Sequence, residues 1–134
     1  MRDTGTYPDN LSRGECLRLM STVGVGRMIY TRQALPAVEL VNFTLDGGDI
    51  VIRTVRDELA SAARDSIIAF ETDHFSPRYK AGWSVTVIGR SREVAQPEPV
   101  TGHEHLLHVT PEIVTGHALR LIPEPHLWSA TVAS

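Results

Sequence analysis

The strongest restriction on how this chain can fold comes from a series of short segments that favour β-strands. They are rich in β-branched and aromatic residues, and turn-forming residues bound each of them; they cover residues 27–31, 37–45, 49–54, 67–73 and 83–90. This composition is typical of strands that place one face in a core. We therefore expect a protein built mainly from β-strands.

The connections between these segments predict antiparallel neighbours. Asp46 and Gly47 begin a tight hairpin between the second and third segments, because glycine readily adopts the positive φ that such a turn needs. Tight hairpins favour an antiparallel barrel over a parallel sheet. Side chains fill the interior of a barrel of about six short strands, so a cofactor would lie outside it, in a cleft such as one between two subunits.

Two segments predict short helices, and a third segment is ambiguous. Ser12 is suited to cap a helix, and Glu15 completes a capping box, with Leu11 as the hydrophobic residue before the cap. Residues 56–64 predict a second helix between strands. For residues 103–125 we expect a short helix, a loop and one more strand over 117–123.

Length and charge limit the class of protein. The chain has 134 residues, so we expect one domain over residues 11–134 after a flexible polar arm at residues 1–10. A net charge of −3 provides no overall positive field that would attract nucleic acid or an anionic membrane. No apolar stretch is long enough to span a bilayer, and the first residues lack the apolar run of a signal peptide. We therefore expect a cytoplasmic protein. The single cysteine, Cys16, excludes an intrachain disulfide.

One constellation suggests an anion site. Arg53 and Thr54 close a predicted strand, Arg56 follows, and a helix begins near Asp57. A strand end followed by a helix start can bring an arginine, a hydroxyl and free backbone N–H groups to a phosphate. Alternatively, Thr54 or Asp57 caps the helix and the arginines are solvated. Asp57 and Glu58 suit the positive end of the helix dipole and would repel a phosphate.

The stretch AGWSVTVIGR, residues 81–90, begins a strand with a Gly-Trp pair. Trp83 or its neighbour Ser84 would be placed to contact a flat ring. The alternative is that Trp83 plugs one end of the barrel, with one strand face in the core and the other amphipathic.

The histidines do not form a recognisable metal motif. His103, His105 and His108 lie close together with Glu104, but residue 107 is a leucine, where the zinc protease motif needs its second histidine. In an extended segment His103 and His105 would share one face, which leaves a metal or haem contact as an alternative to surface histidines. We predict no metal site.

Five stretches in this order resemble the pyridoxamine 5'-phosphate oxidase-like family of flavin-binding proteins, and among them the small bacterial branch that includes nitroimidazole-resistance-type proteins. They are LSRGECLRLMSTVGVGRMIY, AVELVNFTLDGGDIVIRT, IIAFETDHF, GWSVTVIGR and VTPEIVTGHAL, and they span residues 11 to about 121. The resemblance implies a six-stranded antiparallel split β-barrel of Greek-key type with two or three short helices. It also implies a homodimer with two FMN sites at the subunit interface.

The resemblance assigns roles to two groups of residues. It implies that Arg53 and Thr54, with Arg56 beside them, hold the FMN phosphate. It places Val41 and Asn42 beside the edge of the isoalloxazine ring, where a backbone N–H or the amide of Asn42 could bond it.

The resemblance also places Trp83 and Ser84 in the cleft, facing the flavin of the same or the partner subunit. Two positions depart from the family pattern: Glu58 stands where members often carry a lysine that reaches the phosphate, and Leu40 where they usually have a proline. Arg56 would compensate for the charge at Glu58.

The function that follows is that of a flavin-dependent oxidoreductase acting on a small molecule, with no catalytic residue that the sequence identifies. The alternative is a non-catalytic cofactor-binding or sensor protein on the same fold. Its ligand would be haem, with His74 or His105 as axial ligand, or a flavin-type cofactor such as a deazaflavin. An empty cleft is the third possibility.

Overall fold

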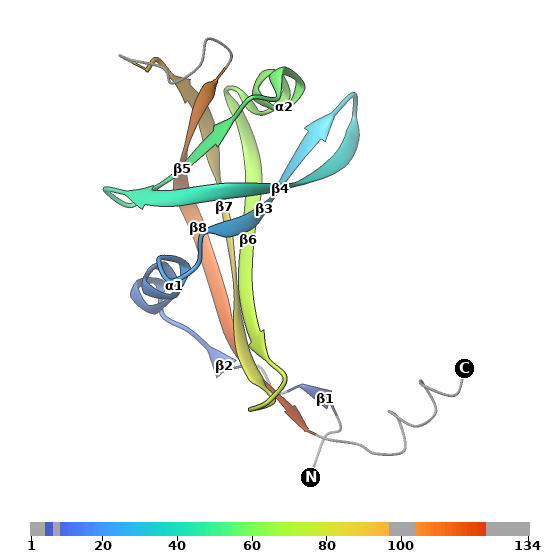
Figure 1. The fold of residues 1–134 in the computed structure, drawn as a ribbon, viewed down its shortest axis with the longest axis vertical. Helices are drawn as coiled ribbons and strands as arrows, with labels where there is room; N and C mark the ends of the chain where they lie inside the picture. Colours follow the sequence, from blue (N-terminus) through green and yellow to red (C-terminus); the bar gives the residue numbers. More distant parts are fainter. Residues whose placement is uncertain (1–4, 7–8, 97–103, 123–134) are drawn as a thin grey trace, which may run out of the picture.

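The computed structural model describes residues 5–6, 9–96 and 104–122, and it shows a β-barrel from which three long strands extend (Figure 1). The elements are, in chain order, β1 (Gly5–Thr6), β2 (Asp9–Asn10), α1 (Arg13–Met20), β3 (Val25–Arg32), β4 (Leu35–Asp46), β5 (Asp49–Thr54), α2 (Asp57–Ala63), β6 (Ser66–Ser76), β7 (Ala81–Val94) and β8 (His105–Ile122).

Six strands close into a ring of antiparallel neighbours. Their order is β8-β5-β4-β3-β6-β7, and a further pairing of β7 with β8 closes the barrel. This confirms the expected fold class, a mainly β, antiparallel six-stranded split barrel with two short helices.

The split lies where β4 changes partners. Residues 35–42 of β4 pair with β3, and residues 43–46 pair with β5. On β5, Arg53 and Thr54 pair with β8 alone. Strands β4 and β5 therefore separate on the Asn42 side of Phe43, and this separation creates the groove described below.

The core is formed by inward-facing residues of all six strands together with both helices. The ring of Phe43 meets the ring of Phe70 edge-on, with 4.8 Å between the centroids. Cys16 and Met20 of α1 are fully buried, as are Leu59 and other residues of α2. The two helices thus cover the barrel where the strands leave it open.

The first helix forms as its local sequence predicts. The Ser12 hydroxyl accepts a hydrogen bond from the Glu15 N–H at 3.2 Å, and the Glu15 carboxylate accepts one from the Ser12 N–H at 3.0 Å. The predicted helix at 56–64 is α2. Of the helices in the described part of the chain, none is long and apolar enough to cross a membrane.

The prediction for the last segment was wrong. Where we expected a short helix, a loop and a strand over 117–123, β8 is continuous over residues 105–122. It pairs with β5 at one end and with β7 along nearly its whole length, and this pairing outweighs local preference. Pro111 fits because it lies at a bulge opposite Gly89, where a strand tolerates a proline.

Four residues of the expected N-terminal arm lie in short strands. Residues 5–6 and 9–10 form β1 and β2, and both pair with the far end of β8 (Figure 1). That end of β8, with β6 and β7, extends beyond the barrel.

Candidate functional site

A groove runs across the outer surface where β4 separates from β5. Three adjoining hollows form it, and each shares lining residues with the next. The first, of about 100 Å³, is lined by Asn42, Phe43, Thr44, Val51 and Arg53. The second is lined by Val25, Leu40, Val41 and Asn42. The third, of about 360 Å³, is lined by Val23, Gly24, Val25, Gly26, Arg27, Leu40 and Asp73. This continuous surface runs from Arg53 on β5 across β4 and β3 to Asp73 on β6, and we call it the β5–β6 groove.

The alternation of side chains along β4 decides which residues face the groove. Leu40, Asn42 and Thr44 are exposed, whereas Val41 and Phe43 point into the core. Asn42 can therefore offer its amide to a ligand. Val41 is only 8% exposed and has its side chain in the core. Of the predicted pair Val41 and Asn42, only Asn42 therefore presents its side chain to the groove.

Arg53 lies at one end of the groove with its guanidinium exposed. Its Nη1 donates to the Gln96 side-chain oxygen at 2.7 Å and contacts the Glu104 carboxylate at 3.5 Å. More than half of the Arg53 side chain is accessible to solvent. An arginine held in this way can still donate hydrogen bonds to an anionic group in the groove.

The side chain of Thr54 does not face the groove with that of Arg53. It is 9% exposed, and its hydroxyl accepts a hydrogen bond from the N–H of Arg56 at 3.0 Å. The side chain of Thr54 therefore shapes the turn into α2, but it is not the helix cap considered above, because the N-cap residue is Arg56 and α2 has no side-chain capping hydrogen bond.

Arg56 and Glu58 are engaged in ion pairs that hold α2. Arg56 Nη1 lies 2.7 Å from Glu39 Oε2, across the split between β4 and α2. Glu58 Oε2 lies 2.9 Å from Arg32 Nη2. Glu39 also accepts a hydrogen bond from the Tyr30 hydroxyl at 3.5 Å, and burial together with this carboxylate raises the pKa of Tyr30. Arg56 is thus paired with the carboxylate of Glu39, and Glu58 is paired with Arg32.

Trp83 and Ser84 lie far from Arg53 within one chain. Arg53 pairs with Leu106 on β8, and Trp83 pairs with Ala118. At about 3.3 Å per residue, roughly 40 Å of extended strand separates these positions. Trp83 packs against the core, and Ser84 leaves the opposite face of β7. Ser84 pairs with Asp73 of β6, which lines the third hollow, so within one chain it lies beside the end of the groove away from Arg53. Another copy of the chain could bring both residues closer to Arg53.

Gly82 explains the Gly-Trp start of this strand. A Cβ at this position would collide with the backbone carbonyl of His74 on β6. Gly82 therefore permits close approach of two strands, and its role is in packing. Arg90, at the end of the same stretch, donates to the Asp65 carbonyl at 3.0 Å and ties β7 to the turn between α2 and β6.

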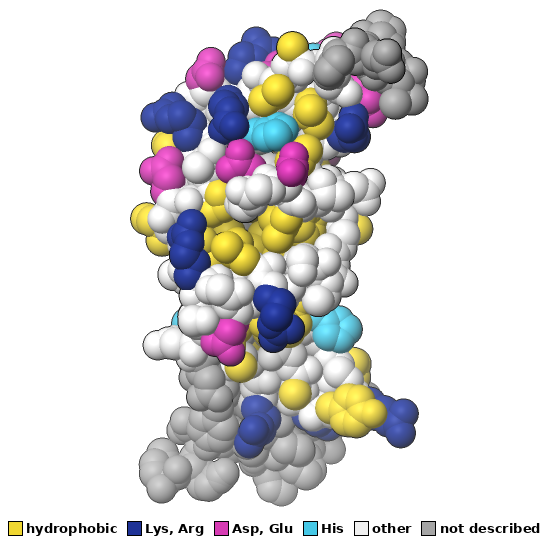
Figure 2. Space-filling model, turned by 90° about the vertical axis from the view of Figure 1, so that its left-hand side faces the viewer, with side chains coloured by type: hydrophobic (Ala, Val, Ile, Leu, Met, Phe, Trp, Pro, Cys, Tyr) yellow, Lys and Arg dark blue, Asp and Glu magenta, His cyan; other side chains and the backbone are white. Residues whose placement is uncertain are grey.

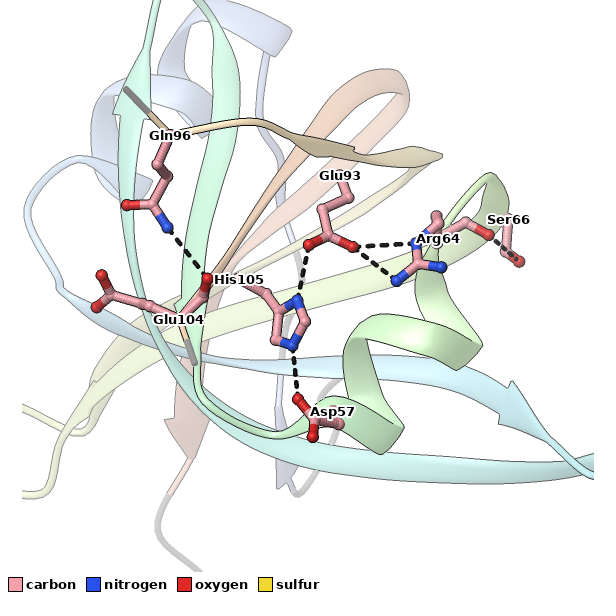
Figure 3. A network of polar contacts seen from close by, with 7 residues as sticks. All are labelled: Asp57, Arg64, Ser66, Glu93, Gln96, Glu104 and His105. Carbon is pink, nitrogen blue, oxygen red and sulfur yellow. Dashed lines mark hydrogen bonds and ion pairs between the residues drawn. The ribbon is translucent and has the colours of Figure 1, made fainter. Parts of the chain in front are cut away.

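A polar network that the sequence did not predict lies beside α2 (Figure 3). His105 Nε2 is 2.7 Å from Asp57 Oδ1, and His105 Nδ1 is 2.7 Å from Glu93 Oε2. Because ionised carboxylates only accept, both contacts are hydrogen bonds when both ring nitrogens are protonated, so this geometry favours the imidazolium form of His105. Glu93 also pairs with Arg64 at 2.8 Å, so both ends of α2 are tied to β7 and β8.

These contacts shift two pKa values. Hydrogen bonds to Asp57 and Glu93 raise the pKa of His105, and the bond to His105 lowers the pKa of Glu93. With both ring nitrogens occupied, His105 offers no position to a haem iron. His103 lies outside the described residues. Among the residues that are described, no three His, Cys, Asp or Glu side chains are grouped so as to hold a metal ion.

A second unpredicted cluster lies at the opposite end of the groove from Arg53. Arg27 Nη1 is 3.2 Å from Glu71 Oε1 and 3.2 Å from Asp73 Oδ2. Spacing along β6 places the two carboxylates on one face, but only the register of β3 against β6 reveals the arginine between them.

The outer surface of the barrel carries a row of apolar residues across five strands. Cross-strand pairs join Val38 to Ile29, Ile29 to Ala69, Ala69 to Ile88 and Ile88 to Ile113. Val38 and Ile113 are 60% and 57% exposed. We call these five residues the apolar row. Hydrophobic side chains also reach the surface elsewhere, as the face on the side of α1 shows (Figure 2).

Comparison with known proteins places this architecture in a family. A family model described as pyridoxamine 5'-phosphate oxidase matches residues 12–126. The chain is 38% identical over 124 residues to the uncharacterized protein Rv0080 of Mycobacterium tuberculosis, with 79% of this chain and 82% of that protein covered.

Solved structures share the fold. The FAD binding protein from Mycobacterium smegmatis superposes with a TM-score of 0.73 at 30% identity, covering 85% of this chain and all of that one (100%). A proposed 5-nitroimidazole antibiotic resistance protein from Bacteroides thetaiotaomicron superposes with a TM-score of 0.72 at 9% identity, covering 88% of this chain and 91% of that one. The second likeness is one of fold alone.

Proposed function

The chain belongs to the pyridoxamine 5'-phosphate oxidase family, and we propose that it binds FMN in the β5–β6 groove. In this proposal it is a flavin-dependent oxidoreductase that acts on a small molecule. The observation that carries this proposal is the order of groups along the groove. An exposed guanidinium stands at one end, an exposed amide follows, and an exposed apolar surface comes next, formed by Leu40 and Val25.

This order fits the parts of a flavin mononucleotide. Arg53 would bind the phosphate through charge-assisted hydrogen bonds. Asn42 and Thr44 would face the polar chain that links phosphate to ring, and Val25 and Leu40 would support the flat ring. From β5 to β6 the groove crosses three strand spacings, roughly 14 Å at about 4.8 Å each, so its length suits an elongated ligand.

The charges near Arg53 favour one phosphate over two. Arg56 and Arg32 are already paired with Glu39 and Glu58, and Glu104 stands beside Arg53. Among these three arginines, Arg53 has the longest ion-pair contact, 3.5 Å to Glu104, so it is the one best able to turn to a ligand. A single cation suits a mononucleotide better than the diphosphate of FAD. A deazaflavin phosphate would satisfy the same contacts.

When bound, the flavin would supply hydride or electron transfer, and the chain's contribution would be to bind and orient it. The apolar floor of the groove would exclude water from one face of the ring. The substrate would stack on the other face.

We further propose that the active form is a homodimer. The apolar row offers a surface that a second copy would cover. The distance between Arg53 and Trp83 supports the same conclusion, because Trp83 and Ser84 of a second copy could approach the Arg53 end of the groove, whereas Ser84 of the same chain lies beside Asp73 at the other end.

The test is the visible absorption spectrum of the purified protein before and after adding FMN, with gel filtration alongside. A flavin spectrum that elutes with a dimer supports the proposal. A Soret band would assign haem instead, and a deazaflavin spectrum would replace FMN by that cofactor. A colourless protein that leaves added FMN free in solution would contradict flavin binding altogether.

A further inference from the structure

The cluster of Arg27, Glu71 and Asp73 lies at the end of the groove opposite Arg53, and its side chains are open to a ligand. The side chains of Arg27, Glu71 and Asp73 are 40%, 37% and 44% exposed. Arg27 and Asp73 line the same hollow as Leu40 and Val25. The apolar part of the groove is therefore bounded by charge at both ends, by Arg53 on β5 and by this cluster on β3 and β6.

The hydrogen bonds within the cluster leave donors and acceptors free. Among the described residues, the contacts of Arg27 all run from Nη1, so Nε and Nη2 remain as donors. Each carboxylate has one oxygen in contact with Arg27, and the second oxygen can still accept. The cluster presents donors and acceptors side by side, with one more negative charge than positive.

A simple surface ion pair accounts for part of this arrangement. Arg27 and Glu71 are direct cross-strand partners, and opposite charges at such positions attract each other on any sheet. Asp73 is different, because the pairing of β3 with β6 ends at Glu71. Asp73 lies two residues beyond the last β3–β6 pair, opposite Ser84 on β7, and it lines the hollow.

We propose that Arg27 and Asp73 recognise the imide edge of the flavin ring, a recognition that rests on the proposed FMN binding. This edge presents a carbonyl, an N–H and a second carbonyl in a row. The Arg27 guanidinium donates to a carbonyl oxygen, and the Asp73 carboxylate accepts from the N–H. Recognition by both groups sets the direction of the ring in the groove, with the phosphate at Arg53.

The experiment compares two ligands that differ at one atom. FMN and its N3-methyl derivative are titrated against the protein, and binding is followed by quenching of flavin fluorescence. Methylation removes the imide N–H and leaves phosphate and ring unchanged. The wild type should bind FMN at least fivefold more tightly than N3-methyl-FMN. Asp73→Ala should bind the two ligands equally, and Arg27→Ala should weaken the binding of both.

Two variants separate recognition from a general effect of charge or folding. Asp73→Asn keeps an oxygen that can accept from the imide N–H, so it should retain the preference for FMN. Glu112→Ala removes an exposed carboxylate on β8 outside the groove, and it should also retain the preference. Circular dichroism of each variant checks that the barrel has formed.

The outcomes distinguish this inference from the proposed function. If FMN binds and Arg53→Ala weakens it, but the wild type binds both ligands equally, the imide contact is overturned and flavin binding stands. The contact is also overturned if Asp73→Ala keeps the fivefold preference. If the wild type binds neither ligand, both proposals fall.

Discussion

Arg53 and Thr54 are neighbours in the chain, but their side chains leave strand β5 on opposite faces. The Arg53 side chain is 55% exposed in the groove, whereas Thr54 is 9% exposed and bonds the backbone of Arg56. Successive residues of any strand alternate in this way. A ligand in the groove therefore meets one of the two side chains, and binding depends on Arg53.

Replacing Arg53 by alanine should weaken FMN binding tenfold or more. A hydrogen bond to a charged group contributes about 1.5–3 kcal/mol, which corresponds to at least a tenfold change in the dissociation constant. Fluorescence titration with FMN measures the effect. Arg90→Ala is the matched control, because Arg90 is an exposed arginine that bonds the Asp65 carbonyl away from the groove. Equal affinities of wild type and Arg53→Ala would remove Arg53 from the site.

Replacing His105 by glutamine should destabilise the protein more at pH 6 than at pH 9. The folded protein raises the pKa of His105 above its ordinary value of 6.5 through hydrogen bonds to Asp57 and Glu93. The stabilisation is therefore complete below pH 6.5 and is lost as the pH rises through the folded pKa. At pH 6 we expect the variant to lose about 1–2 kcal/mol, since the contacts are charge-assisted but partly solvated.

Urea unfolding of both proteins at several pH values measures this difference. The lowered pKa of Glu93 sets the acid limit, because its contribution is present above its ordinary value of 4.5 and is lost as the pH falls through the folded pKa. His74→Gln is the control, since His74 is exposed on β6 and has no ion pair among the described residues. A loss for His105→Gln that is the same at pH 6 and pH 9 would count against the imidazolium.

Replacing Gly82 by alanine should lower the free energy of unfolding by about 2–3 kcal/mol. The new Cβ would collide with the His74 carbonyl, so β6 and β7 would have to separate. Gly14→Ala, in α1, provides the opposite case. No atom lies within 4 Å of a Cβ at Gly14, and alanine should stabilise the helix by about 0.5–1 kcal/mol. Thermal unfolding compares the two variants, and a Gly82→Ala protein as stable as wild type would show that the strands have room.

Replacing Ile113 by glutamate should convert the proposed dimer into a monomer. Ile113 ends the apolar row and is 57% exposed, so a charge there would be buried at an interface between two copies. Sedimentation velocity gives the mass in solution. Tyr79→Glu is the control, because Tyr79 is 71% exposed on the turn between β6 and β7, outside the row. A dimer that survives Ile113→Glu would show that the copies meet elsewhere.

Several features of the fold follow from local sequence. The hairpin after Asp46 depends on the positive φ of Gly47 and Gly48, and the capping box of Ser12 and Glu15 closes within one helical turn. These interactions join residues close in sequence, so a short window contains all the information they need. The strands between 25 and 94 are predicted for the same reason.

The last strand shows where local information ends. Residues 105–122 contain histidines and a proline that predict interruptions, but pairing with β5 and β7 makes the segment one strand. The network of Asp57, Glu93 and His105 likewise joins three distant parts of the chain. Neither feature has a signal in the spacing of nearby residues.

The order of turns and strands in this sequence favours an antiparallel barrel and marks Arg53 as part of a candidate anion site, whereas the split barrel and the role of Asn42 are implied by the resemblance to the family. Which member of each adjacent pair faces the groove depends on the phase of a strand relative to the core. The separation of Arg53 from Trp83 and the meeting of Arg27 with Asp73 depend on strand register. Register is set by packing and pairing between distant segments, and the tertiary structure is therefore the level at which the site is assembled.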